Sequence, residues 1–169
     1  MLRSRAWTLA LLLGCLVALV PIRPVAAWNH DTHRRMVRDA MNVMPSDLKT
    51  LLEANEDALL AGSVAPDVEF HDFYNHVWHV DELYGGGVQT CLKEIDTIIA
   101  LIQKGAPSSE IAREFGILGH YVADISCPLH TSSKDPNEDT YHSTFESDVG
   151  GHLSQITFQF DGLQSVSDP

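Results

Sequence analysis

The stretch that decides the fold is HYVADISCPLH, residues 120–130. His120 and Asp124 are four residues apart, so a helix puts both side chains on one face. Pro128 ends that helix, and His130 follows directly after the break. Imidazole and carboxylate groups are ligands suited to zinc, so the stretch predicts a helix that presents metal ligands at its C-terminal end.

A second pair with the same spacing lies further along the chain, at His142 and Glu146. One such pair alone is typical of an exposed helix whose acid stabilises it. Two pairs with His130 between them instead indicate a metal cluster built between two helices.

The apolar pattern is helical over most of the chain. Segments bounded by Pro, Ser and Gly are predicted to be helices at about 31–43, 46–61, 88–104, 108–126 and 140–149. In the third of these, the side chains predicted to face the core are Cys91, Leu92, Ile95, Ile98, Ile99 and Ile102. Residues 63–87 are predicted to be irregular, and the alternation of Ile156, Phe158 and Phe160 allows a short strand. The predicted class is all-α, as a single helical domain.

Length and charge restrict the function. A chain of 169 residues suits one domain. Its net charge of −12 argues against binding of duplex nucleic acid and against a polybasic membrane anchor. The same charge is compatible with a protein whose bound metal ions supply the positive charge. The nine histidines are many for this length and are the first indication of function.

Residues 1–27 have the pattern of a secretory signal peptide: a basic start, an apolar run, and small residues before position 28. Cleavage before Trp28 would give a secreted or periplasmic protein made of residues 28–169. A lipoprotein signal ending at Cys15 is the competing interpretation, because LLGC loosely resembles a lipobox. Of the remaining cysteines, Cys91 and Cys127 either pair or stay as buried thiols, and the sequence leaves both open.

Further candidate ligands lie upstream. Asp67 follows a proline in a turn, and His71, His76 and His79 come soon after it. His33 lies five residues after Trp28, the predicted new N-terminus. A free α-amine and its own carbonyl form a five-membered chelate on a metal, so export cleavage would itself create a ligand.

These residues together resemble the zinc-dependent phospholipases C, whose motif and fold fungal single-strand-specific zinc nucleases share. Residues 120–130 match the family's H-[YF]-x-x-D-h-x-x-P-h-H motif. Trp28 with His33 resembles the family's mature N-terminus, residues 65–67 its early Asp, and residues 142–146 its late H-S-x-[FY]-E element. The resemblance covers nearly all of residues 28–169, in the same order.

The resemblance implies an all-α fold that holds three zinc ions in one cleft. The implied ligands are Trp28, His33 and Asp124 for one ion, then Asp67, His76, His120 and a bridging Asp124 for the second, then His130, His142 and Glu146 for the third. One histidine from residues 71–79 is implied as a ligand of the second ion. His76 is preferred because residues 74–78 resemble the phospholipases, whereas the likeness of residues 78–81 to the nucleases favours His79. His71 is predicted to be peripheral, and His30 and His152 to face solvent.

The implied chemistry is phosphodiester hydrolysis by zinc-activated water, with Asp67 as the candidate catalytic group that orients or deprotonates that water. Three functions follow. The preferred one is a secreted phospholipase C that acts on phospholipid at a membrane surface and needs no obligate protein partner. The second is a single-strand nuclease or nucleotidase on the same site. The third is a non-catalytic zinc-binding protein, which the short region after Glu146 supports.

Overall fold

The computed structural model describes residues 28–162, apart from the side chain of residue 139. The described elements are α2 (His30–Asn42), α3 (Ser46–Glu53), α4 (Glu56–Gly62), the π-helical turn η1 (Pro66–Phe70), the 3-10 turn η2 (Phe73–His76), α5 (Gly87–Gln103), α6 (Ser108–Ile125), the 3-10 turn η3 (Pro128–His130), α7 (Glu138–Gly151) and the 3-10 turn η4 (Leu153–Gln155). An isolated bridge between His79 and Tyr84 is the one β-type pairing within this range. The all-α prediction is therefore confirmed.

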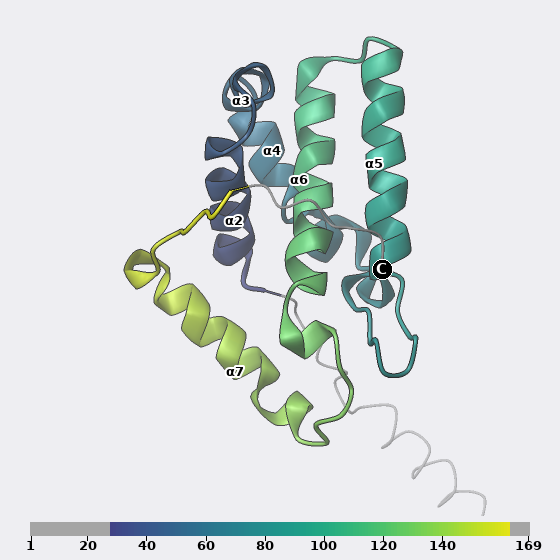
Figure 1. Ribbon diagram of the computed structural model, residues 1–169, viewed down its shortest axis with the longest axis vertical. Coiled ribbons are helices and arrows are strands. Elements are labelled where there is room, and N and C mark those ends of the chain that lie inside the picture. The colour runs from purple at the N-terminus through teal and green to yellow at the C-terminus, as the bar shows by residue number, and fades with distance from the viewer. Residues whose placement is uncertain (1–27, 163–169) are drawn as a thin grey trace, which may run out of the picture.

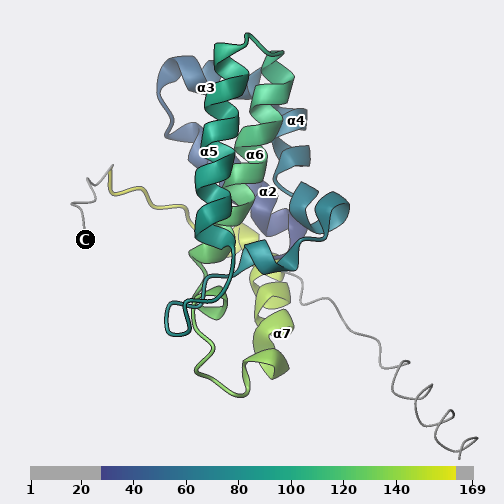
Figure 2. The same cartoon turned by 90° about the vertical axis from the view of Figure 1, so that its right-hand side faces the viewer.

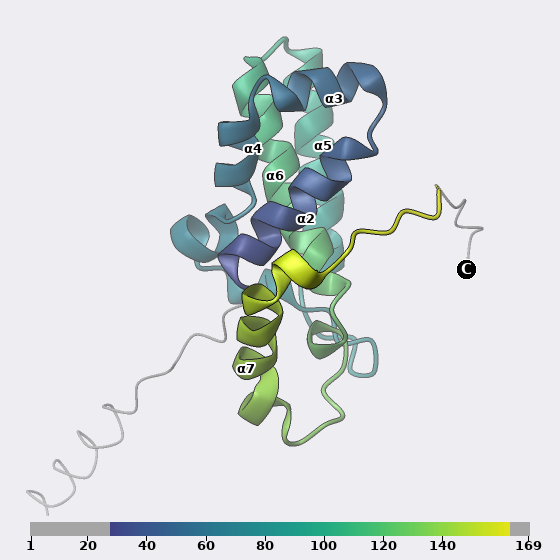
Figure 3. The same cartoon turned by 90° about the vertical axis from the view of Figure 1, so that its left-hand side faces the viewer.

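Helix α6 is the centre of the fold (Figure 1). It packs against α5 on one side and against α4 and α2 on the other. Figure 3 shows α2 lying diagonally across α6. The core between these helices is apolar and contains Val37, Met41, Leu52, Leu59 and Ala112. A second small cluster, Ala65, Cys91, Ile117 and Tyr121, continues the core towards the C-terminal end of α6.

Helices α4 and α6 approach each other through two glycines. A Cβ atom on Gly62 would lie 2.0 Å from the carbonyl oxygen of Arg113, and one on Gly116 would lie 2.1 Å from that of Leu59. The two backbones are therefore in direct contact. This contact brings Ser63, just after α4, against His120 on α6.

Local sequence sets most helix ends. The Asn29 side chain accepts a hydrogen bond from the Asp31 amide, at 2.8 Å, and so caps α2. Prolines precede α3 and α6, and Pro128 follows the end of α6. Glycines 85–87 form the turn into α5, where Gly85 has a φ of 114° that favours glycine.

The structure differs from the sequence prediction in three elements. The single helix predicted over 46–61 is broken at residues 54 and 55 into α3 and α4. The predicted core face of α5 is partly wrong, because Leu92, Ile95, Ile99 and Ile102 are exposed, and the described neighbours of α5 lie on its other side. Residues 156–160 form no strand.

The elements that carry the candidate ligands meet at one end of this helical bundle. The N-terminus of α2, the C-terminus of α6, the loop from η1 to α5, and α7 all lie at that end (Figures 1 and 2). Both cysteines of the described region are buried and unpaired, so Cys91 and Cys127 are thiols in this structure. The predicted signal peptide lies outside the described residues. None of the helices that the structure describes is long and apolar enough to cross a membrane.

Candidate metal centre

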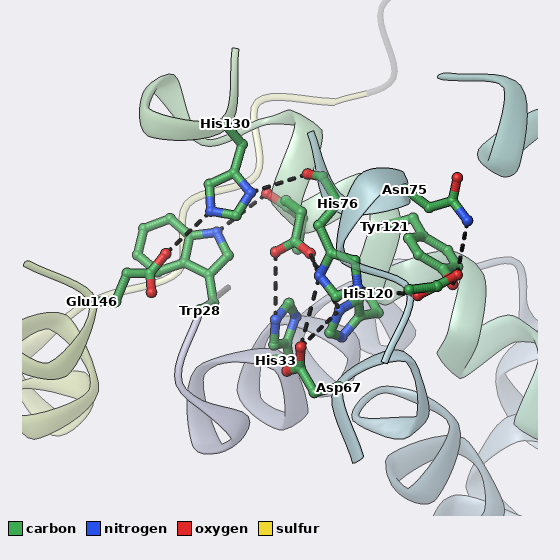
Figure 4. Close-up of polar contacts among 12 residues, drawn as sticks. Trp28, His33, Asp67, Asn75, His76, His120, Tyr121, His130 and Glu146 are labelled. Atoms are coloured by element: carbon green, nitrogen blue, oxygen red, sulfur yellow. Dashed lines mark hydrogen bonds and ion pairs between the residues drawn. The ribbon is translucent and has the colours of Figure 1, made fainter. Parts of the chain in front are cut away.

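Three groups of buried side chains have the composition and spacing of metal sites. Within each group, one ligand atom per residue lies within 4.8 Å of the others. The groups are His33, Asp67 and His120; His76, His120 and Asp124; and His130, His142 and Glu146. Because the first two share His120, they form one continuous cluster, called here the double group, and the last is called the single group. Figure 4 labels four side chains of the double group and two of the single group: His33, Asp67, His76 and His120, and His130 and Glu146.

Asp124 lies at the middle of the double group. Its Oδ1 is 3.5 Å from Nε2 of His33, and its Oδ2 is 3.0 Å from Nδ1 of His76 and 3.2 Å from Nε2 of His120. The carboxylate has no exposed surface. Burial alone would raise the pKa of Asp124, but the close imidazole rings of His120 and His76 outweigh it and hold the pKa below its ordinary value. A buried carboxylate with one oxygen turned to each side can bridge two cations.

Backbone contacts fix the orientation of His120. Its Nδ1 is 2.8 Å from the carbonyl oxygen of Ser63, which can only accept, so Nδ1 carries the proton and Nε2 presents a lone pair to the group. Burial works to lower the pKa of His120, and the attraction of the close Asp124 carboxylate outweighs it, so the pKa is raised in the metal-free protein. The ring is stacked on that of His33 at 3.8 Å between centroids.

The structure places His76, and not His79, in the double group. Nδ1 of His76 is 3.3 Å from Nε2 of His120 and 3.7 Å from Oδ1 of Asp67. His79 instead pairs with Tyr84 across the isolated bridge, with 5.8 Å between their rings. The ligand role of His76 stays a prediction, but the geometry favours it over His79.

Asp67 and His33 are the members of the double group whose pKa values are shifted in the direction that burial dictates. Burial raises the pKa of Asp67, and it lowers the pKa of His33 to about 3, with the neighbouring His120 adding to the shift. His33 is therefore neutral, as a metal ligand must be. His30, predicted to face solvent, is 46% exposed in its side chain but has Nε2 at 3.6 Å from Oδ2 of Asp67.

The single group joins α7 to the segment after α6. Nδ1 of His130 donates to the carbonyl oxygen of His76 at 3.0 Å, and Nδ1 of His142 is 3.2 Å from Oε1 of Glu138. In His130, Nε2 is therefore the nitrogen that can present a lone pair, and the contact with Glu138 favours the same tautomer in His142. The Nε2 atoms of His130 and His142 lie 3.0 Å apart. Oε1 of Glu146 is 3.2 Å from Nε2 of His130 and 2.8 Å from Nε2 of His142.

The residues present fit a bound divalent cation. In each group, ring nitrogens and carboxylate oxygens point at one another at close range, an arrangement that a positive charge among them stabilises. Both oxygens of Asp67 and of Asp124 and both ring nitrogens of His33 are buried without a hydrogen-bond partner. Buried polar atoms are rarely left unpaired, and coordination of a metal would satisfy them. The nitrogen and oxygen donor set suits zinc.

Trp28 is close to these groups but belongs to none of them by its side chain. Its indole nitrogen donates to the carbonyl oxygen of Ala123 at 3.2 Å, and its ring lies 5.7 Å from that of Phe145. These contacts hold residue 28 beside Asp124 on α6 and beside Glu146 on α7. The proposed ligation by the α-amine of a processed chain stays a prediction.

Sequence reasoning missed two carboxylates that contact the predicted ligands. Asp72 contacts the ring of His76, and Glu138 contacts that of His142. Each lies four residues before its histidine, so the same i, i+4 spacing used for His142 and Glu146 could have revealed them. His71 has a φ of 53° and is exposed, and His152 is exposed as predicted.

Comparison with known proteins agrees with this geometry. Residues 32–163 match the family described as zinc dependent phospholipase C. The chain belongs to the zinc-dependent phospholipase C family. No curated protein and no solved structure was found to match it. The three buried groups of this zinc-dependent phospholipase C family member come from the elements that carry the motif residues, and each is a candidate zinc site.

Proposed function

We propose that this protein is an exported phospholipase C that uses three zinc ions to hydrolyse phospholipids into diacylglycerol and a phosphorylated head group. The observation that supports it most directly is the adjacency of the double and single groups, in each of which nitrogen and oxygen donor atoms converge at close range. Family membership supports the reaction class. The signal-like sequence of residues 1–27 supports the export.

Zinc bound in these groups would supply the Lewis acidity and the positive charge that phosphodiester hydrolysis needs. The chain's own residues would contribute the rest. Asp124, buried between His33 and His76, holds the donors of the double group at fixed separations. The ligand sets sit on helix ends and short turns of a packed bundle, so the donors are preorganised and little reorganisation is needed on reaction.

Asp67 is the residue that we propose orients the attacking water and accepts its proton. Its side chain is 8% exposed, so it lies at the edge of the double group, whereas Asp124 is fully enclosed. Burial raises its pKa, which makes the carboxylate a stronger base than an exposed aspartate. His30, at 3.6 Å, provides a partner that can stabilise the carboxylate while it is charged.

Two exposed aromatic side chains flank the groups. Phe73 is 39% exposed, with its ring 5.8 Å from that of His76. Phe145 is 43% exposed and packs against Trp28 beside the single group. Apolar surface at this position suits the diacylglycerol part of a phospholipid. The same rings could stack on bases, so a single-strand nuclease is the second candidate.

The test compares both substrates with and without metal. Zinc-loaded protein is assayed for release of phosphocholine from phosphatidylcholine in mixed micelles and for cleavage of single-stranded DNA, each with and without a chelator. We expect lipid hydrolysis that the chelator abolishes and that Glu146→Gln reduces strongly. Asp96→Asn, which changes an exposed carboxylate on α5, is the matched control and should retain activity. Cleavage of DNA alone would support the nuclease, and zinc binding without either activity would support the non-catalytic protein.

A further inference from the structure

Asp72 is held by two donors that come from different parts of the fold. The hydroxyl of Tyr121, on α6, donates to Oδ2 at 2.7 Å. The amide of Asn75, in η2, donates to the same oxygen at 2.8 Å. The other oxygen, Oδ1, is 3.3 Å from Nε2 of His76. Asp72 therefore connects the fully buried Tyr121 to one predicted ligand of the double group.

This arrangement favours the tautomer of His76 that carries its proton on Nε2. Because Tyr121 and Asn75 both donate to the carboxylate of Asp72, that carboxylate acts as an acceptor, and Nε2 of His76 is placed to donate to it. Nδ1 is then unprotonated. Its lone pair points towards Oδ2 of Asp124, at 3.0 Å, and towards Nε2 of His120, at 3.3 Å.

We propose that Asp72 is a positioning residue that holds His76 with Nδ1 as its metal-binding atom. The inference rests on the proposed zinc centre, because it concerns a ligand of that centre. A carboxylate behind a ligating histidine fixes the tautomer and the ring orientation, and it raises the basicity of the nitrogen that binds the metal. Asp72 would do all three for His76.

The loop around Asp72 is built to keep Asn75 in place. A Cβ atom on Gly86 would lie 2.2 Å from the side-chain oxygen of Asn75, so the loop passes directly against that amide. The amide nitrogen of Gly86 also donates to the carbonyl oxygen of Tyr74, at 2.9 Å. The Asn75 amide is thereby held on one side by Gly86, with its nitrogen turned towards Asp72.

Asparagine at position 72 would keep the shape of the side chain but reverse the direction of its hydrogen bond with His76. Its oxygen would be drawn to the donors of Tyr121 and Asn75, which leaves its NH₂ group facing Nε2 of His76. Nε2 would then have to accept, and the proton would move to Nδ1, the atom that faces the double group. Asp72→Asn should therefore impair metal binding through the tautomer of one ring.

Glu138→Gln supplies the matched comparison, because Glu138 contacts His142 of the single group in the corresponding way. Tyr121→Phe supplies a milder variant that removes one donor from Asp72 and keeps the buried ring. Each purified variant is studied metal-free and during zinc titration at pH 8 against a competing chelator. The imidazole ¹⁵N chemical shifts of the histidines report the tautomers and the zinc-induced changes.

We expect metal-free wild-type protein to show His76 protonated on Nε2, and Asp72→Asn to show it protonated on Nδ1. Zinc affinity at the double group should fall about 10- to 100-fold in Asp72→Asn, and less in Tyr121→Phe. The zinc-induced shifts of His130 should remain. Glu138→Gln should give the opposite result, with a weakened single group and an unchanged His76.

Three results would overturn the proposal. If Asp72→Asn has the wild-type tautomer and zinc affinity, Asp72 does not position His76. If it weakens both groups equally, its role is in general folding. If zinc produces no shift at His76, His33 and His120 in the wild-type protein, the double group is not a metal site and the proposed function fails with it.

Discussion

Removing the metal should release α7 from the rest of the protein. Among the described side chains of this helix, only His142 and Glu146 are buried, at 4% and 3% exposure. The ring of Phe145 contacts Trp28, at 5.7 Å between centroids, but remains 43% exposed. The helix therefore has almost no apolar anchor, and its buried residues are the ones that we propose bind zinc.

The size of the effect follows from these contacts. An isolated helix of 14 residues is marginal in water, and an aromatic pair such as Trp28 with Phe145 contributes about 0.5–1.5 kcal/mol. The metal-free helix should then open at a cost of about 1–2 kcal/mol, which protects its amides only about 5- to 30-fold. Free zinc at about a thousand times its Kd should add about 4 kcal/mol, or about a thousandfold in protection.

Amide hydrogen exchange followed by mass spectrometry measures this directly at pH 8, with zinc and after chelation. Peptides from α7 should lose most of their protection on chelation. Peptides from α6 around Ile117 should change much less, because that helix packs on both apolar clusters. Equal protection of α7 with and without metal would refute the reasoning, since the helix would then be held by contacts other than the single group.

Three further predictions concern single positions. Burial and the adjoining Glu94 raise the pKa of Glu114 to about 7 in the folded protein, whereas the unfolded chain releases this proton near 4.5. The folded state therefore binds the proton more tightly, and the stability of the protein should fall as pH rises from about 4.5 to about 7. Glu114→Gln should remove this loss and raise Tm relative to wild type more at pH 8 than at pH 5; an equal gain at both values would argue against it. His76→Ala should lose a zinc ion that His79→Ala retains, as metal analysis of the two proteins would show, and the reverse order would mean that the loop is misassigned. A form that keeps one extra residue before Trp28 has an amide in place of the free amine and should bind one zinc ion fewer than the processed form, while equal zinc content would remove Trp28 from the ligand set.

The sequence predicted the helices and most of the candidate donors because both depend on local spacing. Residues 120–130 contain a helix, its proline stop and three donors within one short segment, so no tertiary information was needed. The predicted bounds of α2, α5 and α6 agree with the structure within one or two residues. His142 and Glu146 were found in the same way.

Features that depend on tertiary packing could not be predicted. Leu92 and Ile95 have the apolar character of core residues, but their exposure depends on where the neighbouring helices lie. The break between α3 and α4 at Asn55 is stabilised by the Asn55 side chain, whose amide donates to the carbonyl of Leu51 at 2.8 Å. Asparagine occurs both within helices and at their ends, so the sequence alone did not predict the break. The role of Asp72 depends on Tyr121, 49 residues away in sequence.

The contact between α4 and α6 makes the metal centre unequally sensitive to mutation. Where large side chains separate two helices, a substitution is absorbed by neighbouring rotamers, so drift in sequence is tolerated. Neighbouring rotamers cannot make room in this way at Gly62 and Gly116, because a single methyl group added at either position would collide with a backbone carbonyl. The same crossing sets the 2.8 Å bond from His120 to the carbonyl of Ser63. A deep mutational scan should therefore find that Gly62 and Gly116 tolerate no replacement, although neither is a predicted metal ligand or a predicted catalytic residue.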